Sequence, residues 1–183
     1  MLNQLRNVRA LLYKKKFTGY LGRLKRRGLH IGNGTEILDP CFLDPDHCFL
    51  ISIGEDCTLA PNVRLIAHDA STKFHLGFTR IGKITISDRC FIGDSVIVLP
   101  GVTIGPDSII GAGAVVSRDI PGNSVAVGNP ARVVCALDTY IEKIKERSKE
   151  KGVFDDRYLI QNISRRGVAE ILQALEKGEG YIV

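Results

Sequence analysis

The sequence contains no tryptophan, a single methionine and no cysteine pair of the CxxC type. Its five cysteines, an odd number, favour neither a disulfide framework nor a zinc site, so we expect buried, reduced thiols and no bound metal. No apolar run is long enough to cross a bilayer. The N-terminus also lacks the uninterrupted apolar stretch of a signal peptide, because Leu11 and Leu12 run into Lys14, Lys15 and Lys16. We therefore expect a cytoplasmic protein.

Acidic residues are absent from the first 27 positions, which hold nine basic side chains. Because the whole chain carries +5, the remaining residues carry a net charge of −4, and the basic character is local. Residues 1–28 are predicted to form a basic helical segment, whose apolar positions at helical spacing are Leu2, Leu5, Val8, Leu11 and Leu12. Three roles stay open for residues 1–27: packing on a neighbouring subunit, peripheral contact with an anionic membrane surface, or a solvated face. Nucleic-acid binding is not expected, because neither an aromatic platform nor a recognisable motif accompanies the charge.

Glycine is abundant, with 19 residues, and it often follows an aliphatic residue that recurs every six positions. A six-residue period fits neither a helix, at about 3.6, nor a simple strand, at about 2. It predicts a coil in which each hexapeptide forms one short strand and one corner, so that three hexapeptides close a triangular turn around stacked aliphatic side chains. A β-sandwich with accidental spacing is the alternative, and the length of the in-phase run argues against it. The in-phase residues are Ile31 and Ile37, Ile53, Leu59 and Leu65, then Ile86, Ile92, Val98, Ile104, Ile110 and Val116.

The repeat is interrupted twice, at residues 38–52 and at residues 69–83. A loop that leaves a rigid repeat structure is a common place for function. We therefore divide the chain into the basic segment 1–28, a repeat domain 29–136 with the loop excursion 69–83, and a helical appendage 137–183. Within the appendage, one predicted helix is capped by Asp138 and another by Ser164.

His68 is the candidate catalytic residue, because it closes the last regular hexapeptide before the excursion. At that position its ring can face a groove rather than the interior. A neutral imidazole can remove a proton from an alcohol, since it titrates close to physiological pH. The expected role of His68 is thus that of a general base.

The repeat, together with Ala60-Pro61-Asn62-Val63-Arg64-Leu65 and the following His68, resembles the hexapeptide-repeat acyltransferases, in particular the maltose, galactoside and xenobiotic O-acetyltransferases. The resemblance implies an all-β, left-handed parallel β-helix with short helical appendages at both ends. It also implies a homotrimer whose active sites lie between adjacent subunits. Left-handed crossovers are otherwise rare, so this handedness comes from the resemblance and not from the spacing.

The stretch GAGAVVSRDIPGNSVAVGNPARVV matches the segment with which this superfamily binds coenzyme A. Glycine and alanine at the first corner let the pantetheine arm lie against exposed backbone, and arginine suits the nucleotide phosphates. Cys135 stands where related enzymes often carry a second basic residue. The residues that the resemblance assigns to acetyl-CoA are Gly111, Ala112, Gly113, Ser117, Arg118, Asn129, Pro130 and Arg132.

Contacts to the acceptor are expected from Asp39 in the irregular early coil and from Asp69 and His75 in the excursion. Asp44 in the same early coil is a further candidate contact, and both it and Asp39 also suit turns that precede proline. His75 is equally compatible with a solvated loop. His30 and His47 have no supporting pattern.

The sequence and the resemblance together predict an acetyl-CoA-dependent O-acetyltransferase that acts on a sugar or glycan hydroxyl, as in the decoration of capsule or lipopolysaccharide. N-acetylation of an amino sugar or amino acid is one alternative, and a non-catalytic β-helix scaffold is another. The γ-type carbonic anhydrases share the fold but hold zinc with three histidines. Because no histidine follows His75, a metal-dependent hydrase is not expected.

Overall fold

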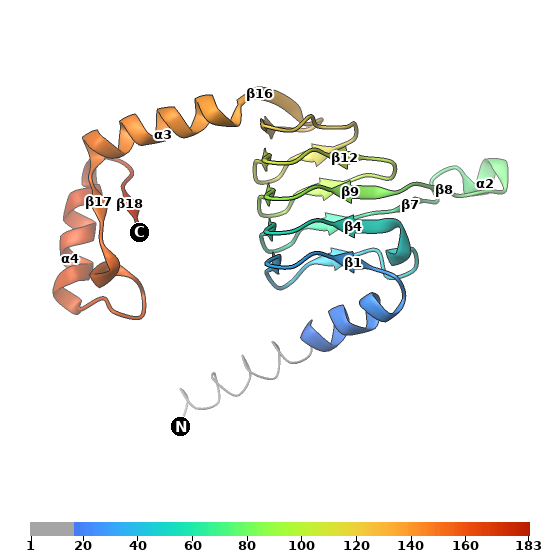
Figure 1. Ribbon diagram of the computed structural model, residues 1–183, viewed down its shortest axis with the longest axis horizontal. Coiled ribbons are helices and arrows are strands. Elements are labelled where there is room, and N and C mark those ends of the chain that lie inside the picture. The colour runs from blue at the N-terminus through green and yellow to red at the C-terminus, as the bar shows by residue number, and fades with distance from the viewer. Residues whose placement is uncertain (1–16) are drawn as a thin grey trace. The chain divides into compact units, whose positions relative to one another are not determined.

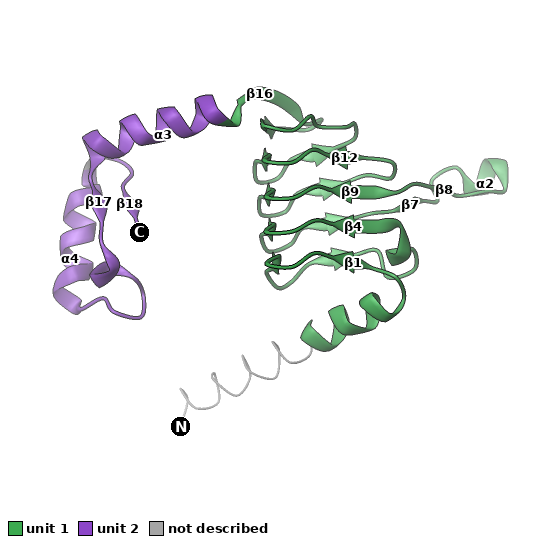
Figure 2. Ribbon diagram, in the orientation of Figure 1, with its two compact units in different colours: residues 1–137 green, residues 138–183 purple. Residues whose placement is uncertain are grey.

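The computed structural model describes residues 17–183, which form two compact units that divide between Leu137 and Asp138 (Figure 2). The predicted apolar stripe of the N-terminal segment lies outside the described residues. Residues 17–26 are helical, and Leu24 and Leu29 are buried in the same hydrophobic cluster as the repeats that follow.

Three parallel sheets make up the repeat region (Figure 1). The first holds β1 (His30–Ile31), β4 (Ile51–Ile53), β9 (Ile84–Ile86) and β12 (Thr103–Ile104). The second holds β2 (Glu36–Ile37), β5 (Thr58–Leu59), β10 (Phe91–Ile92), β13 (Ile109–Ile110) and β15 (Ser124–Val127), which β16 (Arg132–Ala136) joins in antiparallel orientation. The third holds β3 (Phe42–Leu43), β6 (Arg64–Leu65), β11 (Ile97–Val98) and β14 (Val115–Val116). From β1 to β6 and from β9 to β14, consecutive strands belong to successive sheets, so each of these coils contributes one short strand to each sheet.

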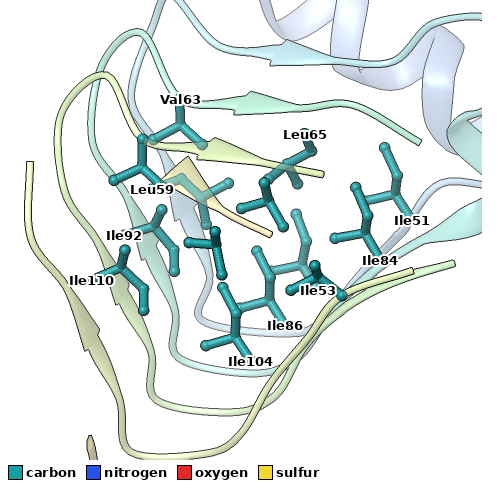
Figure 3. Close-up of a cluster of buried hydrophobic side chains, with 14 of the residues drawn as sticks. Ile51, Ile53, Leu59, Val63, Leu65, Ile84, Ile86, Ile92, Ile104 and Ile110 are labelled. Carbon is teal, nitrogen blue, oxygen red and sulfur yellow. The ribbon is translucent and has the colours of Figure 1, made fainter. Parts of the chain in front are cut away.

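The aliphatic residues at six-residue spacing form the core of these coils (Figure 3). Ile53, Ile86 and Ile104 are in register on neighbouring strands of the first sheet, and the other two sheets repeat the arrangement. Each of these side chains is at most 1% exposed. A small or β-branched residue usually stands four positions after the aliphatic residue, and most of these second residues are also buried, among them Cys57, Cys90 and Ala114. No disulfide links the five cysteines, of which four are buried and Cys135 is partly exposed.

The packing of this core gives a stability prediction. Ile92 is fully buried between Leu59 and Ile110, so Ile92→Ala should lower the free energy of unfolding by about 2–5 kcal/mol through lost burial and a residual cavity. Thr103→Ala, on the exposed side of β12, is the matched control and should change it by less than about 0.5 kcal/mol. Chemical denaturation of both variants measures the difference. Equal destabilisation of the two would contradict a core stacked in this way.

The glycines that follow the aliphatic residues serve close packing of coils rather than the turn itself. A Cβ on Gly93 would lie 2.6 Å from the backbone nitrogen of Ala112 in the next coil. The left-handed backbone positions at the corners are instead taken largely by other residues, including Asn62, with φ 64°, and Asp107, with φ 54°. Asparagine and aspartate tolerate this conformation better than most residues do. Gly93 thus permits the close approach of the next coil, while asparagine and aspartate at the corners permit the turn.

The two interruptions have different structures. Residues 38–52 hold β3 and a short 3-10 helix, η1 (Cys48–Leu50). The second interruption leaves the coils as an antiparallel pair, β7 (His68–Asp69) with β8 (Arg80–Ile81), and carries the one-turn helix α2 (Lys73–Leu76). Figure 1 shows this arm projecting from the stacked coils of its own unit.

The second unit contains α3 (Leu137–Lys151), α4 (Arg165–Ala174), η2 (Asp156–Tyr158), η3 (Leu175–Lys177) and a parallel pair of β17 (Val153–Phe154) and β18 (Tyr181–Ile182). The predicted cap at Ser164 is confirmed, because its side chain accepts a hydrogen bond from the Gly167 amide at 3.0 Å. Asp138 lies within the first turn of α3 rather than before it. A negative charge there still interacts favourably with the helix dipole. None of the helices in residues 17–183 is long and apolar enough to span a membrane.

Candidate active site

His68 lies where the chain leaves the third sheet to enter the arm. It follows β6 by two residues and begins β7, and its side chain is 32% exposed. The chain before His68 belongs to the coils. His68 itself pairs with Ile81 in the antiparallel β7–β8 pair. The ring is therefore anchored at the protein surface with one edge turned inward.

The inward edge of His68 meets Asp44. Nδ1 of His68 lies 2.6 Å from Oδ2 of Asp44, whose side chain is fully buried. The same Oδ2 accepts a hydrogen bond from the amide of Ala67 at 2.8 Å, and Oδ1 accepts one from the amide of His47 at 3.3 Å. Both carboxylate oxygens thus have donors, as a buried charge requires.

These contacts decide the charge of Asp44. Burial by itself raises the pKa of the carboxyl, but the hydrogen bond from His68 and those from the backbone outweigh it and hold the pKa below its usual value. Because the pKa is lowered on folding, ionised Asp44 stabilises the fold above the unfolded value of about 3.9. That contribution is lost as the pH falls through the folded pKa. At neutral pH Asp44 is a carboxylate.

The carboxylate in turn sets the tautomer of His68. An ionised carboxylate only accepts hydrogen bonds, so the hydrogen of the neutral ring is on Nδ1 and Nε2 keeps its lone pair. A histidine held in this way by a buried carboxylate has the arrangement of a general base with an orienting partner. The same carboxylate would stabilise the imidazolium that forms when Nε2 takes a proton.

Sequence reasoning missed the second half of this pair. It considered Asp44 only as an acceptor contact or a turn residue and found no pattern for His47. The register of the coils is what brings Asp44 to His68. Leu43 pairs with Leu65, so the residues after Leu43 lie beside those after Leu65. His47 lies against the same group, with its ring centroid 4.8 Å from that of His68.

The other residues expected to contact the acceptor lie at different places. Asp69 follows His68 directly, and its side chain accepts a hydrogen bond from the amide of Ser71 at 2.9 Å. His75 is exposed in α2, edge-on to Phe74. Asp39 is partly buried at the corner between β2 and β3, and burial raises its pKa. Of these three residues, Asp69 alone is next to His68 in the chain and at the same corner.

The residues assigned to acetyl-CoA fall into three groups in the last coils. Residues 111–113 form the corner between β13 and β14, and nothing lies within 4 Å of the Cβ position of Gly113. Ser117 and Arg118 are exposed just after β14. Residues 128–131 run beside β14, where Gly128 and Ala131 each share a backbone hydrogen bond with Val115.

One of these groups lies near the corner that carries the histidine. Val116 of β14 is in register with Val98 and Leu65, so Ser117 lies over Ile66, two residues before His68, and the strands β14 and β6 are separated by β11 alone in the third sheet. At about 4.8 Å between neighbouring strands, Ser117 and Ile66 are roughly 10 Å apart along the stack. Arg132 is also exposed, and its Nη1 donates to the carbonyl of Ala131 at 2.9 Å.

Comparison with known proteins identifies the repeat. The family model described as "Bacterial transferase hexapeptide (six repeats)" matches residues 83–118. The "Putative acetyltransferase YvoF" of Bacillus subtilis is 30% identical over 135 residues, which are 73% of this chain and 76% of that protein. The chain therefore belongs to the hexapeptide-repeat family, together with proteins that are named as acetyltransferases.

Two further relatives define the extent of the similarity. The "Putative acetyltransferase C18B11.09c" of Schizosaccharomyces pombe is 49% identical over 92 residues, which are 49% of this chain and 44% of that protein. The chain thus spans less than half the length of that relative. Among solved structures, a galactoside acetyltransferase in complex with coenzyme A is similar with a TM-score of 0.51 and 28% identity, over 65% of this chain and 70% of that one.

Proposed function

We propose that this protein is an acetyl-CoA-dependent O-acetyltransferase that acts on a sugar or glycan hydroxyl, with His68 as the general base. The observation that carries the proposal is the 2.6 Å contact between Nδ1 of His68 and the buried carboxylate of Asp44 at the root of the arm. Family membership and the similarity to a galactoside acetyltransferase support the choice of donor and acceptor class. We also propose the left-handed β-helix, the homotrimer and the cytoplasmic location that the resemblance and the sequence imply.

In the proposed catalytic step, His68 and Asp44 are the protein groups that move the proton and stabilise its charge. Acetyl-CoA supplies an activated thioester as the acyl source. Nε2 of His68 takes the proton of the acceptor hydroxyl as its oxygen forms the new ester bond, and the negative charge of Asp44 stabilises the imidazolium. The imidazolium then returns the proton to the thiolate that leaves. No covalent enzyme intermediate is needed, because the acceptor oxygen attacks the thioester directly. Four of the five cysteines are buried in the coils and so are poorly placed to act as nucleophiles.

Residues of the last coils would hold the donor. The open backbone at Gly113 leaves room for a thin pantetheine arm, since no atom lies near its Cβ position. Arg132 and Arg118 are exposed cations that suit phosphate groups. Asp39, Asp69 and His75 remain proposed acceptor contacts, and Asp69 has the strongest claim because it adjoins the base.

The donor site gives the next prediction. Arg132→Ala should raise the KM for acetyl-CoA by about 10- to 100-fold, the loss expected for a hydrogen bond to a charged group, with a smaller change in kcat. Arg89→Ala is the matched control, because Arg89 is an exposed arginine that pairs with Asp107 at 2.7 Å. Initial rates of thiol release at varied acetyl-CoA measure both constants. An equal KM in the two variants would argue against phosphate binding by Arg132.

A panel of acceptors tests the function as a whole. Thiol release from acetyl-CoA should depend on added mono- and oligosaccharides, and mass spectrometry of the product should locate the acetyl group on oxygen. Acetylation of an amine with no acetylation of hydroxyls would replace the O-acetyltransferase assignment by the N-acetyltransferase alternative. Absence of transfer to every sugar, amino sugar and amino acid would favour the non-catalytic scaffold instead.

A further inference from the structure

Three potential metal ligands converge at the candidate base. Asp44, His47 and His68 each offer one ligand atom, and these atoms all lie within 4.8 Å of one another. Oδ1 of Asp44 is 3.8 Å from Nδ1 of His47, and Oδ2 is 2.6 Å from Nδ1 of His68. A metal is not predicted from the sequence, because no histidine follows His75 and no pattern singles out His47.

His47 brings a second, independent observation to the cluster. Its Nδ1 is buried and has no hydrogen-bond partner. A buried nitrogen without a partner costs free energy, and near a carboxylate it is well placed to donate its lone pair to a cation. The two imidazole rings form the outer wall of the cluster, since the side chains of His47 and His68 are 28% and 32% exposed. Rotation of either ring would admit an ion from solvent.

We propose that Asp44, His47 and His68 form a binding site for a zinc ion that switches the base off. Two imidazoles and one carboxylate are a ligand set that zinc takes in proteins, with a fourth position left to water. Zinc bonds of about 2.0–2.2 Å in tetrahedral geometry place ligand atoms roughly 3.4 Å apart. To reach that spacing, the Asp44–His68 contact opens and the Asp44–His47 contact closes, each by less than about 1 Å, and the two histidine nitrogens, which lie within 4.8 Å of one another, close by at most about 1.4 Å.

The effect on catalysis follows from the tautomer of His68. In the metal-free site the hydrogen is on Nδ1 and the lone pair on Nε2 acts as the base. When zinc binds through Nδ1, the hydrogen of the neutral ring moves to Nε2, and no lone pair remains to accept the proton of the acceptor. The proton count of the ring is unchanged, and zinc has taken the place of the hydrogen bond to Asp44. This effect on turnover rests on the proposed function, whereas the binding of zinc does not.

The test measures binding and turnover separately. After treatment with EDTA and its removal, the wild-type protein is titrated with zinc sulfate alone by calorimetry, and thermal unfolding is recorded with and without zinc. Wild type should bind one zinc ion per chain and gain thermal stability. His47→Gln should bind zinc at least about tenfold more weakly, because even the loss of an outer-shell partner weakens metal sites by 10- to 100-fold. His30→Gln, a change at an exposed histidine of β1, is the matched control and should behave as wild type.

The turnover arm adds zinc to the acetyl-transfer assay. Zinc should inhibit wild type and His30→Gln at concentrations at least tenfold below those that inhibit His47→Gln. Equal zinc affinity in the wild type and His47→Gln, or no bound zinc at all, would overturn the metal site whatever the turnover assay gives. Zinc binding of the expected stoichiometry without transfer to any acceptor would leave the site standing and refute the proposed function.

Discussion

Replacing His68 by glutamine should lower kcat for acetyl transfer by about 10²- to 10⁴-fold, the usual contribution of a positioned general base. Glutamine keeps a polar side chain of similar reach but cannot accept and return a proton near neutral pH. The KM for acetyl-CoA should change little, because the proposed donor residues lie in the last coils. Steady-state kinetics with the best acceptor of the panel measure both constants.

His30→Gln provides the control for that change, because it removes an exposed histidine from the coil that carries β1. Its kcat should match the wild type. A circular dichroism spectrum and a melting temperature like those of the wild type show that His68→Gln remains folded. Undiminished turnover in folded His68→Gln would rule out the base, and the arrangement with Asp44 would then be structural.

Much of the fold was predictable because each coil of the repeat requires a buried aliphatic residue at six-residue spacing, and this spacing is visible in the sequence. An interior as narrow as that of these coils accepts one aliphatic residue from each two-residue strand, so a residue such as Ile92 recurs at a fixed interval whatever the surface carries. The role of Gly93 was not predictable in the same way. The sequence shows a glycine beside a corner, but only the approach of Ala112 from the next coil shows why a side chain is excluded.

The candidate site was predictable only where it coincides with the repeat. His68 marks the end of a regular coil, so the pattern itself singles it out. Asp44 and His47 come from the irregular stretch, where proline and a 3-10 helix displace the six-residue spacing, and they approach His68 through the register of β3 with β6. Asp44 and His68 are 24 residues apart in the sequence, and they meet because their coils stack on one another. Where an interruption breaks the six-residue spacing, counting residues does not show which positions of two stacked coils face each other.

The second large effect is expected for Asp44→Asn. In the wild type Oδ2 accepts from both the Ala67 amide and Nδ1 of His68, so an asparagine oxygen at that place keeps both hydrogen bonds but loses the charge opposite His68. In the other orientation the amide nitrogen faces both groups, so the Ala67 amide loses its acceptor, the hydrogen of the ring is on Nε2 and the base is in the wrong tautomer. We expect kcat to fall by about 10²- to 10⁴-fold, since the same change in a Ser-His-Asp triad costs about 10⁴-fold.

Kinetics separate this positioning role from a structural one. Asp44→Asn should lower kcat with little change in the KM for acetyl-CoA, whereas Asp107→Asn, which removes the charge facing the exposed Arg89, should leave both constants as in the wild type. Because both residues act on one proton transfer, the double variant with His68→Gln should be hardly slower than His68→Gln alone. Multiplicative losses in the double variant would mean that Asp44 acts independently of His68. Such a result would refute the pair on which the proposed mechanism depends.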